Sequence, residues 1–373
     1  MPHDLVIIAE DWGRHPSSTQ HLARELAASR KVLYVNSLGL RRPRLTRADL
    51  RRVVRKFLDL FATRPATEIE SRPANLTVLA PLALPFPGNA LAGRINRWLL
   101  GRRIRRAMAQ LGIARPVLWL SMPTGIDAVG TLGEKAVVYY CGDDFGALDG
   151  VDHAPVLQLE QRCIEAARLI FAVSAILAER MPTTKTMLLE HGVDLDLFTR
   201  PAPRALDLPA GLVAGYYGNI CERVDQALLA ATARALPDWT FVLIGDVRVP
   251  VEQLTAEPNI RLLGRRPHAA LPGYVQHWTV SLLPFLDTAM VRASSPLKLR
   301  EYLAAGRPVV TTAMPAVMPF ADVTAIAVES SGFVEAIRAG AAAPPDPERL
   351  RRRVSGESWA GRAAAAAARI DAL

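Results

Sequence analysis

The chain has 373 residues, of which 50% are hydrophobic and 22% are charged, and its net charge is +9. This length suits two domains with separate cores, and the composition indicates a globular protein. The three cysteines, Cys141, Cys163 and Cys221, are odd in number and far apart, so we expect neither a disulfide framework nor a structural zinc site. Such cysteine usage is typical of a reducing cytoplasm.

The positive charge is concentrated in two stretches. Residues 41–72 contain ten Lys or Arg and four acids, and residues 94–106 contain six Arg and no acid. This distribution favours an anionic partner: a phospholipid surface, a pyrophosphate-linked lipid or nucleic acid. Nucleic acid is the least favoured, because no aromatic residues alternate with the basic ones. Prolines interrupt the longest apolar stretch, residues 76–92, so we expect no membrane-spanning helix, and the first residues do not have the pattern of a signal peptide.

The first elements along the chain predict a βαβ unit. Residues 4–9 are expected to form a strand, residues 19–29 a helix and residues 31–36 a second strand. The loop at residues 10–18 would then lie at the carboxyl edge of a parallel sheet, where α/β proteins bind ligands. This loop has no Gly-x-Gly-x-x-Gly sequence, which argues against a dinucleotide-dependent enzyme.

Two basic helices are expected next. Residues 50–61 place apolar side chains at helical spacing with basic residues between them, and residues 92–111 repeat this arrangement with six arginines. Each is either an interfacial membrane anchor or an ordinary helix with a solvated basic face. We favour contact with an anionic membrane surface.

Two acidic residues follow a predicted buried strand. Strands are expected at residues 117–121 and 136–141, and Asp143 and Asp144 come directly after the second. A carboxylate at the carboxyl end of a strand can take the proton from an attacking hydroxyl group. The other interpretation is that one of the two caps the following turn. We expect one to act as the base and one as the cap, without choosing between them.

The remaining elements of this half are a helix at residues 156–167, a strand at 169–174 and a helix at 175–180. The proline-rich residues 200–211 predict a linker, after which a second βα pattern begins. Its strands are expected at residues 213–217, 241–245, 260–263 and 280–284, with a helix at 271–277. Gly218 and Asn219 follow the first of these strands, so their backbone can approach a phosphate, and Arg223 would add positive charge.

A ligand-binding helix start is predicted before the last strand, residues 308–312. Ser294 and Ser295 stand where a helix cap belongs, so the helix is expected to begin at one of them. Its free N–H groups, the two hydroxyls and Lys298 would hold a phosphate-bearing ligand, and Glu301 would accept hydrogen bonds from a ribose. The alternative is an amphipathic helix with a Lys–Glu surface pair.

The segment SSPLKLREYLAAGRPVVTT, residues 294–312, resembles the donor-nucleotide segment of group 1 glycosyltransferases of the GT-B fold, in which Glu-x-x-Ala-x-Gly-x-Pro-Val-Val recurs. It is more similar to the teichuronic-acid-type and xanthan glucuronosyltransferase-like enzymes than to the two-Glu retaining members, because Ala293 stands where those have a second Glu. The resemblance implies an α/β protein with two Rossmann-like, doubly wound domains that face a central cleft.

The resemblance also implies how the chain is divided. Residues 1–205 would form the acceptor-binding domain, with a basic helical insertion at about 41–72. Residues 206–355 would bind the nucleotide sugar, and residues 356–373 would form a helix that crosses back to the first domain.

Site residues follow from the same resemblance. The catalytic base would be Asp143 or Asp144, and the acceptor would be bound by Trp12, Arg14 and His15, although a lone His at a helix start is more often a surface residue. The expected donor-binding residues are Gly218, Asn219, Arg223, Arg265, Ser294, Ser295, Lys298 and Glu301. No metal and no cofactor is expected apart from the nucleoside-diphosphate sugar, for which a UDP-sugar is favoured.

The function that results is a metal-independent glycosyltransferase that moves a sugar to a hydroxyl acceptor, lipid-linked or an envelope polysaccharide, with inversion. A bacterial, cytoplasmic protein on the inner face of the plasma membrane is expected, without a nucleic-acid partner. Two alternatives stay open: a nucleotide-sugar epimerase on the same fold, and a non-catalytic membrane-surface subunit.

Overall fold

The computed structural model describes residues 2–13, 17–36, 72–81, 84, 86, 88–148, 151–327 and 329–373. The chain divides into two compact units, Met1–Glu190 with Arg362–Leu373, and His191–Gly361. The helix expected at residues 50–61 lies outside the described residues, as does the insertion at 41–72 except for Arg72.

The division falls after Glu190, whereas the sequence placed the boundary after residue 205. The segment after Glu190 is bonded to the second unit. Gln276 Nε2 donates to the carbonyl oxygens of Phe198 and Arg200, at 2.9 and 2.8 Å, and Ala205 N–H donates to Gly273 O at 2.9 Å. These bonds attach residues 198–205, which include the first part of the proline-rich stretch, to the second unit.

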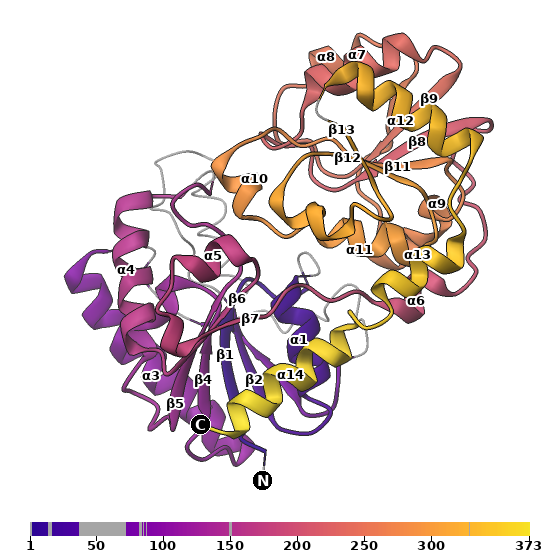
Figure 1. The fold of residues 1–373 in the computed structure, drawn as a ribbon. Helices are drawn as coiled ribbons and strands as arrows, with labels where there is room; N and C mark the ends of the chain where they lie inside the picture. The colour runs from indigo at the N-terminus through magenta and orange to yellow at the C-terminus, as the bar shows by residue number, and fades with distance from the viewer. Residues whose placement is uncertain are drawn as a thin grey trace. The chain divides into compact units, whose positions relative to one another are not determined.

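The first unit contains a parallel seven-stranded sheet with the order β3-β2-β1-β4-β5-β6-β7 (Figure 1). Its central strands are fully buried, which explains their continuous apolar sequences. The strands are β1 Leu5–Ala9, β2 Val32–Asn36, β3 Leu76–Leu79, β4 Val117–Leu120, β5 Ala136–Cys141, β6 Leu169–Ala172 and β7 Thr186–Leu188.

The helices of this unit are α1 Ser18–Leu26, α3 Ala90–Leu111, η1 Pro123–Ala128, α4 His153–Ala166, α5 Ala175–Glu179 and η2 Thr183–Lys185. The long basic helix predicted at residues 92–111 is thereby confirmed as α3. Its N-cap is Asn89, whose side chain accepts from Ala92 N–H at 2.9 Å, and it ends at Gly112 with φ 62°. Both α3 and α4 pack against η1, so these three elements lie together.

The C-terminal helix α14, Trp359–Asp371, starts in the second unit, and its residues from Arg362 onward belong to the first. Asp371 fixes its end there. Its carboxylate pairs with Arg30, with Nη1 to Oδ1 at 2.8 Å, and accepts from His3 N–H at 3.1 Å. The last turn is therefore anchored beside the start of β1.

The second unit has a parallel six-stranded sheet with the order β10-β9-β8-β11-β12-β13 (Figure 1). Its strands are β8 Leu212–Tyr217, β9 Trp239–Ile244, β10 Ile260–Leu262, β11 Val280–Leu283, β12 Val309–Thr312 and β13 Ala325–Ala327. Its helices are α6 Leu195–Thr199, α7 Gln226–Ala235, α8 Glu252–Thr255, η3 His268–Ala270, α9 Pro272–Val275, α10 Ala289–Ala293, α11 Leu297–Ala304, η4 Pro315–Phe320, α12 Ser330–Ala342 and α13 Pro347–Val354.

Both faces of this sheet are covered by a hydrophobic core. Alternate residues of β8 enter different cores: Val213 and Tyr217 pack in the core that includes α11 and α13, whereas Ala214 and Tyr216 pack in the core that includes α7 and α12. Because side chains of a strand alternate between the two faces, one apolar strand serves both layers. In each unit the carboxyl ends of the parallel strands meet at one edge, which is where the candidate site residues occur.

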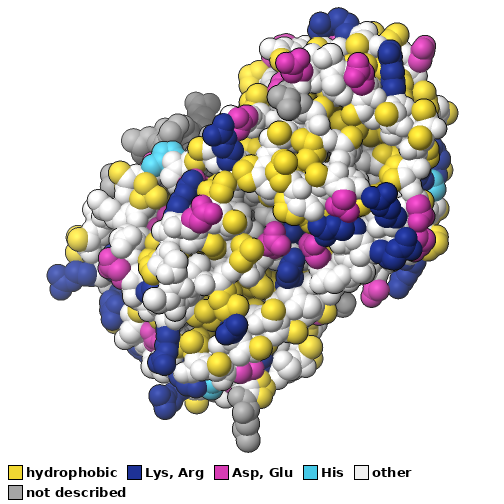
Figure 2. Space-filling view, viewed as in Figure 1, with side chains coloured by type: hydrophobic (Ala, Val, Ile, Leu, Met, Phe, Trp, Pro, Cys, Tyr) yellow, Lys and Arg dark blue, Asp and Glu magenta, His cyan; other side chains and the backbone are white. Residues whose placement is uncertain are grey.

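In the part of the chain that the structure describes, no helix combines the length and apolar character needed to cross a bilayer. Lys and Arg side chains occur over both units on the face that Figure 2 shows.

Candidate active site

The helix expected to begin at Ser294 or Ser295 begins instead at Leu297, so that prediction is wrong. Pro296 is the N-cap of α11, in an extended conformation with φ −74° and ψ 106°. Ser294 ends the preceding helix, α10, and its hydroxyl donates to Val291 O at 2.8 Å. Ser295 accepts from Arg300 Nη1 at 3.3 Å. Because Pro296 is itself extended, Ser295 is not directly followed by a helical residue and does not open the helix.

Lys298, in the first turn of α11, lies beside the loop that follows β8. Its Nζ is 5.8 Å from the centroid of the Tyr216 ring and 6.0 Å from that of Phe285. A Cβ atom on Gly218 would lie 2.3 Å from Lys298 Cε, and Gly218 has φ +136°, so only glycine suits this position. Burial, with a further contribution from the positive charge of Arg223, lowers the pKa of Lys298 to about 8.

The loop at Gly218 is held by its neighbours. Gly218 N–H donates to Ile244 O at 2.7 Å, and the Tyr216 hydroxyl donates to Asn219 O at 3.1 Å. A Cβ atom on Gly245 would lie 2.0 Å from Gly218 O, so the loops after β8 and β9 run in close contact. The result is a fixed backbone turn beside a partly buried ammonium group, which suits a phosphate.

Glu301 is only 3% exposed, and both of its oxygens are hydrogen-bonded. Oε1 lies 2.8 Å from His268 Nε2, and Oε2 accepts from the Tyr217 hydroxyl. Burial and the charge of Glu301 raise the pKa of Tyr217, so this phenol stays a donor. Tyr217 and His268 were not identified from the sequence. Only an indirect signal for them was present in the sequence, since a carboxylate on an otherwise buried helix requires hydrogen-bond donors.

The other predicted donor residues lie on an exposed loop or are hydrogen-bonded within the protein. Arg265 lies on the exposed loop that leads to His268, next to Arg266, which pairs with Asp207 at 2.6 Å. Ser294 and Ser295 are occupied by Val291 O and by Arg300, as described above. The fully buried Arg300 also pairs with Glu357, so its role is to hold the start of α11.

In the first unit, the acidic pair after β5 has two different environments. Asp144 Oδ1 accepts from Gly146 N–H at 3.0 Å, and Oδ2 lies 2.5 Å from Arg180 Nη1. This is the geometry of a turn cap reinforced by an ion pair. Asp143 is the more exposed of the two.

A carboxyl group that the sequence did not single out lies near Asp143. Glu10 follows β1; it accepts from the Ser17 hydroxyl, and its backbone oxygen accepts from the Tyr34 hydroxyl at 2.9 Å. Burial, with a contribution from the negative charge of Asp143, raises the pKa of Glu10 to about 7. The available signal was an acid directly after a buried strand. The carboxyl ends of β1 and β5 thus bring a near-neutral carboxyl group toward Asp143.

Trp12 is the one predicted acceptor residue inside the described part of the chain, since Arg14 and His15 lie outside it. Its backbone N–H donates to Asn36 Oδ1 at 3.1 Å. Its ring meets Tyr34 edge-on at 4.8 Å between centroids, and the Arg24 guanidinium lies 5.4 Å from its centroid. Trp12 is therefore held at the edge of the sheet, two residues after Glu10.

Among the described residues, no three His, Cys, Asp or Glu side chains gather closely enough to hold a metal ion. The chemistry that these sites offer is charge stabilisation by Lys298 and acid–base work by Asp143 and Glu10.

Comparisons with known proteins concern the family and the fold. Residues 212–342 match the model of the family described as Glycosyl transferases group 1. A Bacillus subtilis (strain 168) protein named as the teichuronic acid biosynthesis glycosyltransferase TuaH is 28% identical over 224 residues, which are 54% of this chain and 56% of that protein. The match therefore spans little more than half of that relative's length.

Solved structures match over the whole chain. Anabaena HepE in complex with UDP and glucose has a TM-score of 0.70 at 14% identity, and the match covers all of both chains. Sucrose-phosphate synthase from Thermosynechococcus elongatus has a TM-score of 0.70 at 17% identity and matches over 98% of this chain and 97% of its own. The resemblance to group 1 glycosyltransferases and the GT-B fold expected from the sequence are thus confirmed.

Proposed function

We propose that this chain, which has the GT-B fold and whose residues 212–342 match the group 1 glycosyl transferases, moves a sugar from a nucleoside diphosphate to a hydroxyl acceptor. The observation that carries the proposal is the close approach of Lys298 to Gly218, with the buried Glu301 one turn along the same helix. Lys298 offers a positive charge for a diphosphate, and Glu301 offers a carboxylate that can accept from a ribose. UDP is the favoured nucleotide, since the structure of HepE holds UDP.

The donor would bind with its diphosphate at the start of α11. Lys298 and the N–H groups that open the helix would stabilise the negative charge that develops as the sugar–phosphate bond breaks. Glu301, oriented by Tyr217 and His268, would accept from the ribose hydroxyls. Because these groups supply the charge stabilisation, we propose a reaction that needs no metal and no cofactor.

Asp143 is our choice for the base, because it is the more exposed of the two, whereas Asp144 has the geometry of a turn cap in an ion pair with Arg180. The acceptor oxygen would attack the anomeric carbon while Asp143 takes its proton, and the nucleoside diphosphate would leave. Ala293 in place of a second Glu favours inversion. Glu10, with its pKa of about 7, would lose its proton near neutral pH, and the negative charge beside Asp143 would therefore depend on pH.

The acceptor class that we propose is a lipid-linked sugar or an envelope polysaccharide, reached at the inner face of the plasma membrane. The support is the surface of α3. Leu91, Ile95 and Trp98 are 67%, 37% and 63% exposed and recur at the spacing of one helix face, on a helix that carries six arginines and no acid. Such a surface suits an anionic bilayer.

The first test is a thermal-shift series with UDP, GDP, TDP, CDP and ADP, with and without EDTA. A ligand at one hundred times its dissociation constant adds about 2.7 kcal/mol to the free energy of unfolding. We expect UDP to stabilise the protein equally in EDTA and to lose most of this effect in Glu301→Gln. Glu335→Gln, an exposed acid of the same unit, is the matched control.

The second test follows the donor itself. Cleavage of a UDP-sugar only when an acceptor is present supports the transferase. A changed sugar on an intact diphosphate would mean an epimerase, and no stabilisation by any diphosphate would contradict the proposed donor site.

A further inference from the structure

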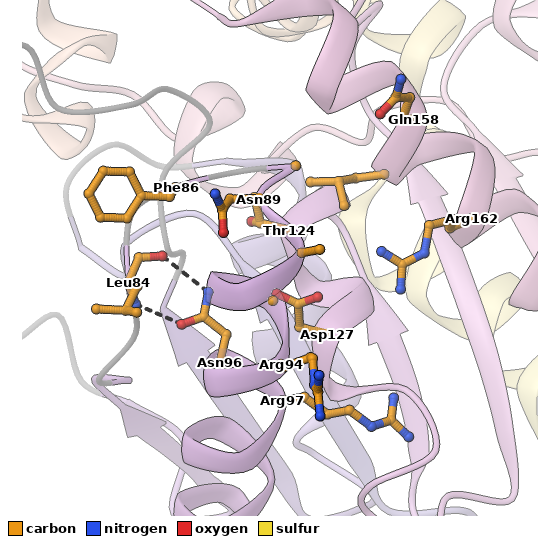
Figure 3. Close-up of a pocket in the computed structure, with 14 residues that line it drawn as sticks. Leu84, Phe86, Asn89, Arg94, Asn96, Arg97, Thr124, Asp127, Gln158 and Arg162 are labelled. Atoms are coloured by element: carbon orange, nitrogen blue, oxygen red, sulfur yellow. Dashed lines mark hydrogen bonds between the residues drawn. The ribbon is translucent and has the colours of Figure 1, made fainter.

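The first unit contains a pocket of about 360 Å³ that none of the residues discussed above for donor or base chemistry lines. It lies between the start of α3, η1 and α4 (Figure 3). Its volume is in the range of small-molecule sites. The polar residues that characterise it are Asn89, Arg94, Arg97, Thr124, Asp127 and Arg162.

The pocket is positively charged. Three arginines line it, and in the described part of the chain neither Arg94 nor Arg162 forms a hydrogen bond or an ion pair with another residue. Arg97 is partly engaged, since its Nη1 donates to Val129 O at 2.7 Å. The N-terminus of the 22-residue helix α3 also opens here, with Asn89 as its cap and no acid in its first turn. Helix dipole and guanidinium groups together favour an anion.

Thr124 gives an independent sign of a ligand. It lines the pocket and is 5% exposed, and its Oγ1 has no hydrogen-bond partner among the described residues. A buried hydroxyl without a partner is unfavourable, and a polar atom of a bound molecule would satisfy it.

Asp127 shows that the ligand must offer more than negative charge. It lies between the helix that carries Asn96 and the helix that carries Arg162 (Figure 3). Burial raises the pKa of Asp127, whereas the charge of Arg162, a hydrogen bond with Asn96 and the charge of Arg97 oppose this change. Asp127 thus already has protein neighbours, and the remaining acceptor positions of its carboxyl group can take hydrogen bonds from the hydroxyls of a ligand. Phe86, 45% exposed at the rim, offers an aromatic surface for a sugar ring.

We propose that this pocket binds an acidic saccharide, a hydroxylated ring that carries a phosphate or a carboxylate. Arg94 and Arg162 bind the anionic group, and Asp127 and Thr124 bind the hydroxyls. The site contains none of the donor residues, so a test of this proposal is independent of the proposed sugar transfer.

The test is isothermal titration calorimetry of the full chain with glucose 1-phosphate, glucuronate, glucose and inorganic phosphate. We expect glucose 1-phosphate or glucuronate to bind, and glucose and phosphate to bind at least about tenfold more weakly, because each lacks half of the contacts. Binding of glucose 1-phosphate alone identifies a sugar phosphate as the ligand, and binding of glucuronate alone identifies a uronate.

Three variants locate the binding. Arg94→Gln and Thr124→Val are expected to weaken it, the first by about tenfold. Arg106→Gln, an equal change on an exposed arginine of α3 outside the pocket, leaves it unchanged. The stabilisation by UDP is retained in both pocket variants, which shows that they fold. Binding that survives Arg94→Gln but is lost in Lys298→Met would overturn the proposal, as would no binding of either acidic sugar.

Discussion

Replacement of Lys298 by methionine should stabilise the free protein and weaken its binding of UDP. A fall in the lysine pKa from 10.5 to about 8 corresponds to a penalty of about 3 kcal/mol on the charged form in the folded protein. The side chain keeps part of its surface exposed, so we take about half of this, about 1.5 kcal/mol. Methionine keeps the apolar stem, and Lys298→Met should therefore raise the free energy of unfolding at pH 7 by about that amount.

The sign of the pH dependence follows from the lowered pKa. Below pH 8 Lys298 is charged in both the folded and the unfolded chain, so the wild type carries the whole penalty. Between pH 8 and pH 10.5 the folded protein binds fewer protons than the unfolded chain, and the penalty disappears. The free energy of unfolding of Lys298→Met should thus exceed that of the wild type by the full amount below pH 8, and the difference should be lost by about pH 10.5.

The same substitution, Lys298→Met, should weaken the binding of UDP. Loss of one charge-assisted hydrogen bond costs about 1.5–3 kcal/mol, or roughly 10- to 150-fold in affinity. The wild-type affinity should also fall as the pH rises above 8, whereas that of Lys298→Met should stay flat. Urea unfolding and calorimetric titration measure the two quantities, with the exposed Lys135→Met as the control. A destabilised variant, or a wild-type affinity that is constant from pH 7 to about 9.5, would refute this reasoning.

Three further predictions concern single side chains. Gly218→Ala should weaken UDP binding about tenfold and destabilise the fold by about 1–2 kcal/mol, since its φ is positive and its Cβ would displace Lys298; titration and urea unfolding test this. Asp143→Asn should lower the turnover number at least about 100-fold with UDP binding unchanged, whereas Asp144→Asn should mainly lower the melting temperature; the reverse result would exchange their roles. Arg300→Met should destabilise the protein by about 3 kcal/mol, because it removes the ion pair at 2.5 Å with Glu357 and leaves Arg353 as a more distant cation at 3.8 Å, and an unchanged urea midpoint would contradict this.

Local sequence was sufficient for the elements whose pattern is strong. The buried strands β1, β5, β8 and β11 are short apolar runs ended by turn residues, and each lies where the sequence placed it. The long helix α3 was equally clear from its spacing. Both faces of a parallel sheet are covered, so its strands must be apolar along their whole length, and this can be seen without the tertiary structure.

Elements with weaker patterns were not predicted. The edge strands β3, β7 and β13 have only three or four residues, the helices α7 and α12 are alanine-rich, and the short, arginine-rich α13 has only two buried apolar residues, Leu350 and Val354. Their conformation depends on packing against the sheet, which local propensity does not encode.

The sequence by itself predicted Lys298 and Glu301 as donor-binding residues, because a family pattern contains both. Only the tertiary structure decided what surrounds them. The partners of Glu301 are Tyr217, 84 residues earlier, and His268, 33 residues earlier. Glu10 and Asp143 likewise come together only because β1 and β5 end at the same edge of one sheet. Burial and neighbouring charge set the protonation of such groups, and both depend on the order of the strands in space.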